Sequence, residues 1–436
     1  MEKNNSFFDF EKTSKSEWIQ KIEKDLKGKP LSILEKQLEE NVNVNAVYGE
    51  EDLPDNLFEI YKKSSGWNFA ESFSKEASNA DVLAALARGI NELNIPFSNS
   101  FIRQIQGVET SFINLNLVIE TAKDLEDLKS EETIESLHNL RIINDPLNRA
   151  IKTGEKIDLS SYGSWNLSSG ICVDLLHLQN AGASVVQQMA AFLGTLSEYV
   201  SIVGSSKLQN TYLRVGVSKN YFLEIAKLRA LRLVFETFCE AHDAEGSLKI
   251  SAETSLSDYA RLDSKTNILR ATTQAASAII GGADAVAISP FEAMNVEQSE
   301  LSKRVARNIH HLLKEESHLD VVNDPSKGSY YVENLTNELA QKAWAKFVEI
   351  DKSGGYASAL KDGWFQHEVM GTASQMQELF KNSSKTIIGV NKYPNTLEKP
   401  AKIQLKKLDD ELTETIVLDA LNFALPIELE KQNNNE

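Results

Sequence analysis

His177 is the histidine whose sequence position best suits catalysis. It directly follows the apolar run Val173–Leu176 and precedes the polar turn Gln179–Gly182. If the apolar run is a strand of a parallel barrel, His177 lies at the carboxyl end of that strand, where barrel enzymes place their working side chains. The other interpretation is a rim histidine whose ring is satisfied by neighbouring backbone carbonyls. The pattern by itself leaves both interpretations open.

A second group of histidines raises the question of a metal site. His310, His311 and Glu315 fall close together on one predicted helix, so a ring and a carboxylate could lie one turn apart. The same helix carries several basic residues, which favours a solvated charged face. Sequence motifs for dinucleotide, P-loop, zincin, serine-hydrolase and zinc-ribbon sites are missing. The sequence therefore predicts no metal ligands.

Composition makes nucleic-acid-binding, disulfide-rich and membrane-spanning classes of protein improbable. The 436 residues include 46 Lys and Arg against 63 Asp and Glu, which gives a net charge of −17 and disfavours nucleic acid or anionic lipid as partners. The two cysteines, Cys172 and Cys239, sit in apolar runs and are expected to be buried, reduced thiols. No stretch reaches the roughly 20 apolar residues of a membrane span, and the first twelve residues do not resemble a signal peptide. We expect a cytoplasmic protein.

Short β-like runs alternate with long amphipathic helices over about 250 residues. The predicted strands are Ser111–Leu117, Ile171–Leu176, Tyr212–Val217, Leu248–Ala252 and Ala285–Ser289. The predicted helices are Ala80–Leu93, Ala183–Ile202, Tyr221–His242, Asn267–Ile280 and Ser299–Leu313. This alternation indicates parallel βαβ units, either in a closed (β/α)₈ barrel or in a doubly wound sheet.

An N-terminal helical arm precedes the alternating region. Between Ser14 and Glu40 the apolar residues follow a helical spacing that Gly28–Pro30 interrupts, which predicts two short helices. The arm is too short and too charged to fold alone, so its apolar stripe needs a surface, either on its own barrel or on another chain. The stripe consists of Trp18, Ile22, Leu26, Leu31 and Leu34.

Several of these segments together resemble the methylmalonyl-CoA mutase family, over residues 14–395 and in the family's order. The most specific match is the run DPSKGSYYVENLTNEL at residues 324–339. Other matches are DLKGKP in the arm, NADVLAALARG, HLQNAGA at 177–183, FLEIAKLRALR at 222–232, NILRATTQAASAIIGGADA at 267–285, RVARNIHHLLKEES at 304–317 and IIGVNKY at 387–393. The resemblance implies an α/β fold: a (β/α)₈ TIM barrel at residues 61–350, an N-terminal helical arm at 1–60 and a C-terminal helical extension at 351–436.

The same resemblance implies a chemistry. The family consists of adenosylcobalamin-dependent isomerases that interconvert methylmalonyl-CoA and succinyl-CoA by a radical rearrangement, with the CoA ester threaded through the barrel. The family's cobalamin domain carries a DxHxxG loop whose histidine ligates cobalt, and this motif is missing from the 436 residues. We therefore expect no cobalamin domain and no cofactor bound by this chain, with adenosylcobalamin held by a partner.

Departures from the family pattern concern the barrel interior. His177 and Gln179 match family site residues, but Leu176 stands where the family has a tyrosine. The family's site residues in segments 249–256 and 281–293 are mostly replaced, largely by apolar or small residues. We expect large apolar side chains to fill the bore of the barrel, and we assign no catalytic residue beyond the remnants His177 and Gln179.

Retention of the framework with loss of the site resembles a small (β), non-catalytic or weakly catalytic subunit. Such a chain would pair as a heterodimer with a catalytic large subunit, with the arm contributing to the contact, and the mutase reaction would take place in the partner. The resemblance leaves acyl-CoA binding by this barrel open. The alternative is the catalytic barrel of a split acyl-CoA mutase that uses cobalamin held by a separate protein. His177 and Gln179 favour it, whereas Leu176, Ser251 and the stretch Ala283–Ser289 oppose it.

Overall fold

The computed structural model describes residues 13–38, 42–54, 57–60, 66–160, 162–165, 170–295, 298–395 and 414–433. Its centre is one eight-stranded parallel sheet in which strands adjacent along the chain pair with one another at every position but one, and the last strand pairs with the first. This cyclic order confirms a nearly closed (β/α)₈ barrel and excludes the doubly wound sheet. The strands are β3 (Asn68–Ser72), β4 (Glu92–Pro96), β5 (Asn114–Val118), β6 (Leu140–Ile143), β7 (Ile171–Asp174), β8 (Thr211–Val217), β9 (Leu248–Thr254) and β10 (Ala285–Ala287).

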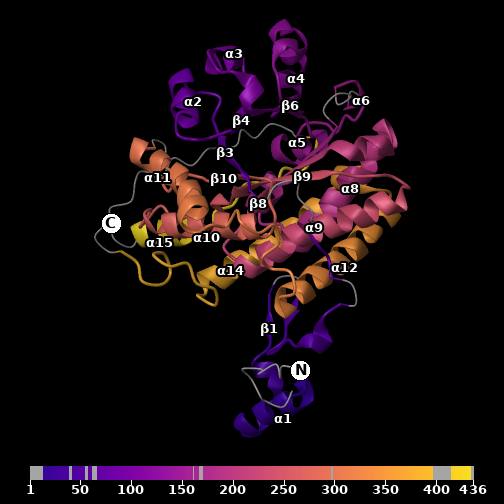
Figure 1. The fold of residues 1–436 in the computed structure, drawn as a ribbon, viewed down its shortest axis with the longest axis vertical. Helices are drawn as coiled ribbons and strands as arrows, with labels where there is room; N and C mark the ends of the chain where they lie inside the picture. Colours follow the sequence, from indigo (N-terminus) through magenta and orange to yellow (C-terminus); the bar gives the residue numbers. More distant parts are fainter. Residues whose placement is uncertain are drawn as a thin grey trace, which may run out of the picture.

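Helices surround the barrel and extend beyond it (Figure 1). The helices of the barrel region are α2 (Asn79–Leu86), α3 (Phe101–Gln104), α4 (Ala122–Lys129), α5 (Pro146–Thr153), α6 (Tyr162–Trp165), α7 (Leu176–Asn180), α8 (Val185–Val203), α9 (Tyr221–Ala241), α10 (Thr266–Ile280) and α11 (Glu300–His311). The chain continues in α12 (Tyr330–Lys352), α13 (Tyr356–Lys361), α14 (Trp364–Lys381) and α15 (Leu425–Asn433). Among the described residues, none of these helices is long and apolar enough to cross a bilayer.

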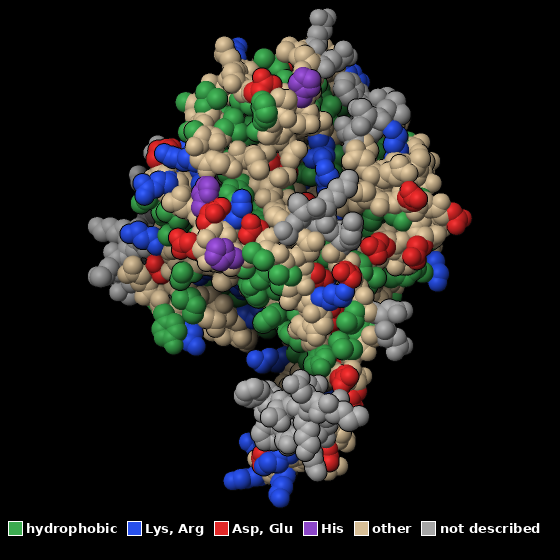
Figure 2. All heavy atoms as spheres, in the orientation of Figure 1, with side chains coloured by type: hydrophobic (Ala, Val, Ile, Leu, Met, Phe, Trp, Pro, Cys, Tyr) green, Lys and Arg blue, Asp and Glu red, His purple; other side chains and the backbone are tan. Residues whose placement is uncertain are grey.

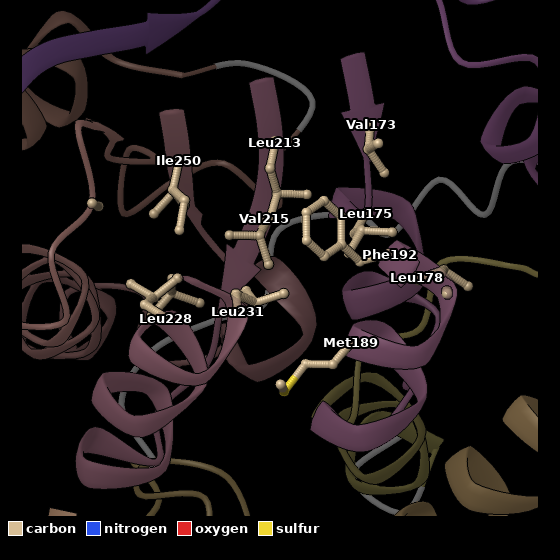
Figure 3. Close-up of a cluster of buried hydrophobic side chains, with 14 of the residues drawn as sticks. Val173, Leu175, Leu178, Met189, Phe192, Leu213, Val215, Leu228, Leu231 and Ile250 are labelled. Atoms are coloured by element: carbon tan, nitrogen blue, oxygen red, sulfur yellow. The ribbon is translucent and has the colours of Figure 1, made fainter. Parts of the chain in front are cut away.

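The main hydrophobic core lies between the strands and the outer helices. In Figure 3, apolar side chains on the outward faces of β7, β8 and β9 point toward α8 and α9. All of them are buried: Val173, Leu213, Val215 and Ile250 from the strands, Met189 and Phe192 from α8, and Leu228 and Leu231 from α9. Because side chains alternate along a strand, the neighbours of these residues point into the barrel.

The structure confirms the five predicted strands with small shifts at their ends. Three further strands of the barrel, β3, β4 and β6, were not predicted. The expected helix Ala80–Leu93 is wrong at its end, since α2 stops at Leu86 and Leu93 lies in β4. The missed strands carry inward polar residues such as Asn68, Glu92 and Arg141, which interrupt the apolar runs that mark a buried strand.

The arm forms a lobe of its own next to α12. Helix α1 (Lys15–Asp25) starts with a capping box at Ser14 and contains no buried residue. After it, a short two-stranded ladder pairs β1 (Lys36–Gln37) with β2 (Asn43–Val44), and the Asn334 side chain of α12 donates to the Asp52 carbonyl at 2.6 Å. Figure 2 shows the lobe standing out from the body, with Lys and Arg side chains at its far end. The first of the two predicted arm helices is confirmed, whereas the second is only a three-residue 3₁₀ turn at Leu31–Ile33.

A fully buried arginine ties the barrel to the segments that precede and follow it. Arg229 of α9 pairs with Asp324, donates to both carboxylate oxygens of Glu333 at 2.8 and 2.9 Å, and donates to the Phe58 carbonyl at 3.1 Å. Asp324 and Glu333 belong to the run DPSKGSYYVENLTNEL, so the ion pairs give that motif a structural role. Buried charges of this kind are stable only as a set, because the loss of one leaves the others unpaired.

The substitution Arg229→Met tests the contribution of these buried ion pairs to stability. The substitution keeps the length of the side chain but leaves two buried carboxylates without their cation, so we expect the free energy of unfolding to fall by about 3–5 kcal/mol. Urea unfolding followed by circular dichroism measures the change. Arg304→Met, on the exposed face of α11, is the control and should change the free energy by less than about 0.5 kcal/mol. Equal midpoints for the two variants would contradict the assignment.

Candidate functional site

The bore of the barrel is filled by a polar network centred on Glu92 of β4. This carboxylate is buried and accepts from Tyr212 at 2.8 Å, from Asn116 at 2.9 Å and from Asn68 at 3.0 Å. Arg141 donates to Asn116 and places its guanidinium 3.9 Å from the centre of the Tyr212 ring. Burial, with Glu92 alongside, raises the pKa of Tyr212 well above its usual value, so the phenol stays protonated as a donor.

The prediction of a bore packed with large apolar side chains is therefore wrong. Apolar residues in the departing segments, Ile250 and Val286 among them, lie on the outward strand faces and pack in the main core. Their inward neighbours, Ser251, Glu253 and Ala285, are polar or small. Because inward and outward positions alternate along a strand, replacements counted along the sequence do not tell which face they change.

A second polar layer lies nearer the mouth, by which we mean the carboxyl ends of β3–β10 and the loops that follow them. Arg214 donates to Asp174 at 2.8 Å and to Glu253 at 3.1 Å, and Glu253 also accepts from Ser72 at 2.7 Å. Burial alone would lower the pKa of Arg214, but the two carboxylates outweigh it and raise the pKa. The guanidinium is thus held as a cation and is shared between two carboxylates.

A cavity of about 500 Å³ opens at the mouth over the ends of β3, β9 and β10. Its two cationic side chains are both paired with carboxylates: Arg307 with Glu71 at 2.6 Å and Lys303 with Asp81 at 2.8 Å. Four carboxylates line the cavity against these two cations; they are Glu71, Glu76, Asp81 and Glu253. An anionic ligand entering this cavity meets a negative excess and has no cation that lacks a carboxylate partner.

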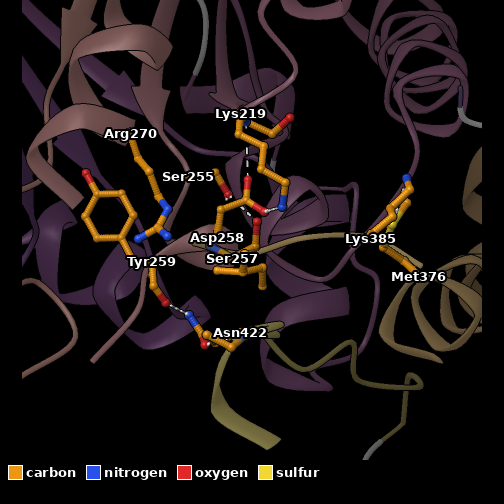
Figure 4. A network of polar contacts seen from close by, with 12 residues as sticks. Lys219, Ser255, Ser257, Asp258, Tyr259, Arg270, Met376, Lys385 and Asn422 are labelled. Atoms are coloured by element: carbon orange, nitrogen blue, oxygen red, sulfur yellow. Dashed lines mark hydrogen bonds and ion pairs between the residues drawn. The ribbon is translucent and has the colours of Figure 1, made fainter. Parts of the chain in front are cut away.

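A second cavity, of about 350 Å³, lies between the ends of β7–β9 and α14. Its wall includes the ion pair of Lys219 with Asp258 (Figure 4). Lys219 also lies over the ring of Phe380 of α14, 4.2 Å from its centre. The floor is made of buried polar side chains, including Gln179, Gln188 and Ser184. This side of the mouth is covered by α14 and by the C-terminal segment.

His177 lies at the predicted end of β7, but it does not point into the bore. Its Nε2 lies 2.6 Å from the carbonyl oxygen of Leu418 in the C-terminal segment. Burial lowers the pKa of His177, so the ring is neutral near pH 7. The geometry agrees with a rim histidine that is satisfied by a backbone carbonyl.

Gln179 is likewise held inside the protein. Its Oε1 accepts from Gln188 at 2.9 Å and from the buried Lys227 at 3.3 Å. Gly216 of β8 lies directly beneath it, and a Cβ at that position would come within 2.4 Å of the Gln179 side chain. The retained histidine and glutamine are thus brought near each other by α7, and each is engaged in contacts within the protein.

The other candidate residues have structural surroundings. His310 is buried rather than solvated: it stacks on Phe69 with ring centres 4.7 Å apart and accepts from Trp67 Nε1 at 3.3 Å. Burial, together with the neighbouring His311, lowers the pKa of His310 to about 3. Within the described part of the chain no three His, Cys, Asp or Glu side chains form a group that could hold a metal ion. Both cysteines are buried and free, as predicted.

The barrel has a seam between β6 and β7, which are the two ends of the strand order. Asp145, just after β6, closes this seam at the mouth: it accepts the Asp174 N–H at 2.9 Å, the Tyr199 hydroxyl at 2.5 Å and the Asn148 N–H at 3.0 Å. Burial raises the pKa of Asp145 to about 6 although these hydrogen bonds favour the ionised form.

Comparisons with known proteins all point to one family. The methylmalonyl-CoA mutase family model matches residues 155–423. A protein of Porphyromonas gingivalis named methylmalonyl-CoA mutase small subunit is 26% identical over 97% of this chain and 76% of its own length. The small subunit of Streptomyces virginiae is 34% identical, and the methylmalonyl-CoA mutase of Rhizobium meliloti is 32% identical. These two matches cover 59% and 57% of this chain but only 45% and 36% of the relatives' own lengths.

The pKa of Asp145 predicts a pH dependence of stability. A carboxyl group whose pKa is raised on folding contributes stability below its unfolded value of 3.8, and this contribution is lost as the pH rises through about 6. Asp145→Asn removes the titration, so the variant should gain up to about 3 kcal/mol relative to the unmodified protein between pH 4 and pH 7. Urea unfolding at both pH values measures the gain.

The control is Asp362→Asn, which changes an exposed aspartate after α13. Its stability relative to the unmodified protein should stay nearly constant over the same pH range. A difference between Asp145→Asn and the unmodified protein that does not vary with pH would show that Asp145 does not titrate in this range.

Proposed function

Because the chain belongs to the methylmalonyl-CoA mutase family, we propose that it acts as a non-catalytic small subunit that forms a heterodimer with a catalytic large subunit. The interconversion of methylmalonyl-CoA and succinyl-CoA then takes place in the partner, which also holds adenosylcobalamin. The names of the relatives in Porphyromonas gingivalis and Streptomyces virginiae, which contain the words small subunit, support such a pairing.

The observation that carries this proposal is the mutual pairing of the charges at the mouth. A mutase must hold an anionic CoA ester and fix its acyl group with polar contacts. Here Arg214, Arg307 and Lys303 are each bound to carboxylates of the same chain, and the open cavity is lined by more carboxylates than cations. Binding the ester would require breaking these internal ion pairs. The chemistry of the mouth therefore favours a structural role.

The described residues of the mouth also do not fit a corrin. The C-terminal segment crosses the ends of β6, β7 and β9, and the ring of His177 is bound to that segment. The other histidine near the mouth cavity, His310, is buried against Phe69. These contacts support the assignment of the cobalamin to the partner.

Turnover by purified proteins tests the proposal. The chain alone, given adenosylcobalamin and methylmalonyl-CoA, should produce no succinyl-CoA above the rate without protein. Mixed with the large subunit of the same organism, it should elute as one complex in size-exclusion chromatography, and that complex should turn over at a rate typical of enzymes, on the order of 10 per second. Turnover by this chain with a separate cobalamin-binding protein would instead support a split mutase.

The arm supplies a second prediction. Trp18, Ile33 and Leu34 are 45%, 51% and 43% exposed, which leaves a set of apolar side chains on this lobe without cover from the described residues. The paired substitutions Trp18→Ala and Leu34→Ala should weaken binding to the large subunit at least tenfold in a titration calorimeter. Since neither side chain is buried, the unfolding midpoint should not change.

Phe112→Ala is the matched control for the arm. Phe112 is 84% exposed and lies on the barrel before β5, so its loss removes a similar area of exposed apolar surface at another place. Binding by this variant should equal that of the unmodified chain. Unchanged affinity of the arm variant would place the contact elsewhere.

A further inference from the structure

The C-terminal segment from Glu414 to Glu428, called here the mouth strap, runs across the ends of several barrel strands. Along it, backbone N–H groups donate in turn to carbonyls of the segments that follow β6, β7 and β9, including α5 and α7. These bonds join Glu414 to Gly154 at 3.0 Å, Leu418 to Ile151 at 2.8 Å, Leu421 to Asn180 at 2.7 Å and Phe423 to Ser257 at 2.9 Å. The strap thus bridges the β6–β7 seam as well as the mouth.

Two polar side chains anchor the end of the strap. The Asn422 amide donates to the carbonyls of Leu256 and Tyr259, both at 2.8 Å (Figure 4). Glu428, which is buried in α15, accepts the N–H groups of Arg261 and Leu262, both at 2.9 Å. Both anchors therefore bind the loop that follows β9.

The strap is held by backbone bonds to other segments, whereas the barrel strands are held by ladders with their neighbours. Residues 416–422 form neither helix nor strand, so their backbone bonds go to other segments. Leu418 packs in the main core, whereas Phe423 and Ala424 belong to a small separate apolar cluster; its members are Ala260, Phe380, Ile387, Val390, Phe423 and Ala424. Local opening proceeds most readily where few apolar contacts must be broken. Phe423 also lines the cavity of about 350 Å³ between the ends of β7–β9 and α14.

We infer that the mouth strap is a releasable lid, which keeps His177 covered and narrows the cavity beside Phe423 until the strap lifts as a unit from an intact barrel. The hydrogen bond of His177 to Leu418 is broken in that movement. This inference goes beyond the proposed function and holds whether the mouth is catalytic or structural.

Hydrogen exchange in the full chain, followed by NMR or mass spectrometry under native conditions, tests the inference without any substitution. The amides of Leu418, Leu421 and Phe423 should exchange with one common opening equilibrium, at least tenfold more often than the amides of β8. If the strap amides exchange only together with β8, the strap is part of the global folding unit and the inference is wrong.

A matched pair of variants on α15 provides the second test. Glu428→Ala removes the acceptor of two backbone N–H groups, whereas Glu430→Ala, two residues further on, removes a largely exposed partner of Lys381. Carbethoxylation of His177 should become at least tenfold faster in Glu428→Ala and stay unchanged in Glu430→Ala. His310, buried in the main body, reports whether the barrel remains folded.

The outcomes of the labelling experiment are distinct. Faster reaction of His177 with His310 still protected supports a lid that opens alone. Equal reaction of His177 in the two variants contradicts it. Exposure of His177 and His310 together in Glu428→Ala means that the strap and barrel unfold as one, which also contradicts it.

Discussion

Burial of charge inside the barrel is the constraint on which the rest of the structure depends. A charge removed from water must be matched by a partner or by several hydrogen bonds, or the fold loses several kcal/mol. Arg214 is matched by Asp174 and Glu253, and Glu92 by a ring of amide and hydroxyl donors. These contacts fill the bore and hold strands from opposite sides of the barrel together. The same contacts occupy the groups that a catalytic barrel would turn toward its substrate.

The need to pair buried polar groups also explains why the family-matching residues at the mouth are present. His177 binds the carbonyl of Leu418, and Gln179 binds Gln188 and Lys227 over Gly216. Each of these side chains has a structural reason to be present, because its removal would leave a buried polar partner unsatisfied. Their presence therefore has a structural explanation that does not depend on catalysis.

The sequence predicted the outer framework of the barrel better than its interior. Strands such as β8 and helices such as α9 are continuous apolar or amphipathic runs, and the order of strands and helices follows from them. The bore could not be predicted in the same way, since residue types were compared with the family without knowing which face each residue occupies. A signal was present: Asn114–Val118 alternates Asn with Leu and Val, and Leu140–Ile143 places an arginine in an apolar run. Period-two alternation of this kind marks a strand with one polar face. The contacts of His177 with Leu418 and of Arg229 with Asp324 join residues far apart in the sequence, so no local pattern encodes them.

Asp145 and the mouth strap both bridge the seam that the strand pairing leaves in the barrel. Where two neighbouring strands of a barrel do not form a backbone ladder, other contacts must hold them together. In this barrel the missing ladder is the one between β6 and β7. Asp145 bridges the gap from within through the Asp174 N–H, and the strap bridges it from outside by bonding first to Ile151 and then to Asn180. The inner bridge is a buried carboxylate whose ionisation opposes folding, whereas the outer one consists of backbone hydrogen bonds and of the Leu418 side chain, which packs in the main core. The part of the mouth over β6 and β7 is therefore closed by separate side-chain and backbone contacts instead of a continuous ladder, and any movement of the mouth in this chain should begin there.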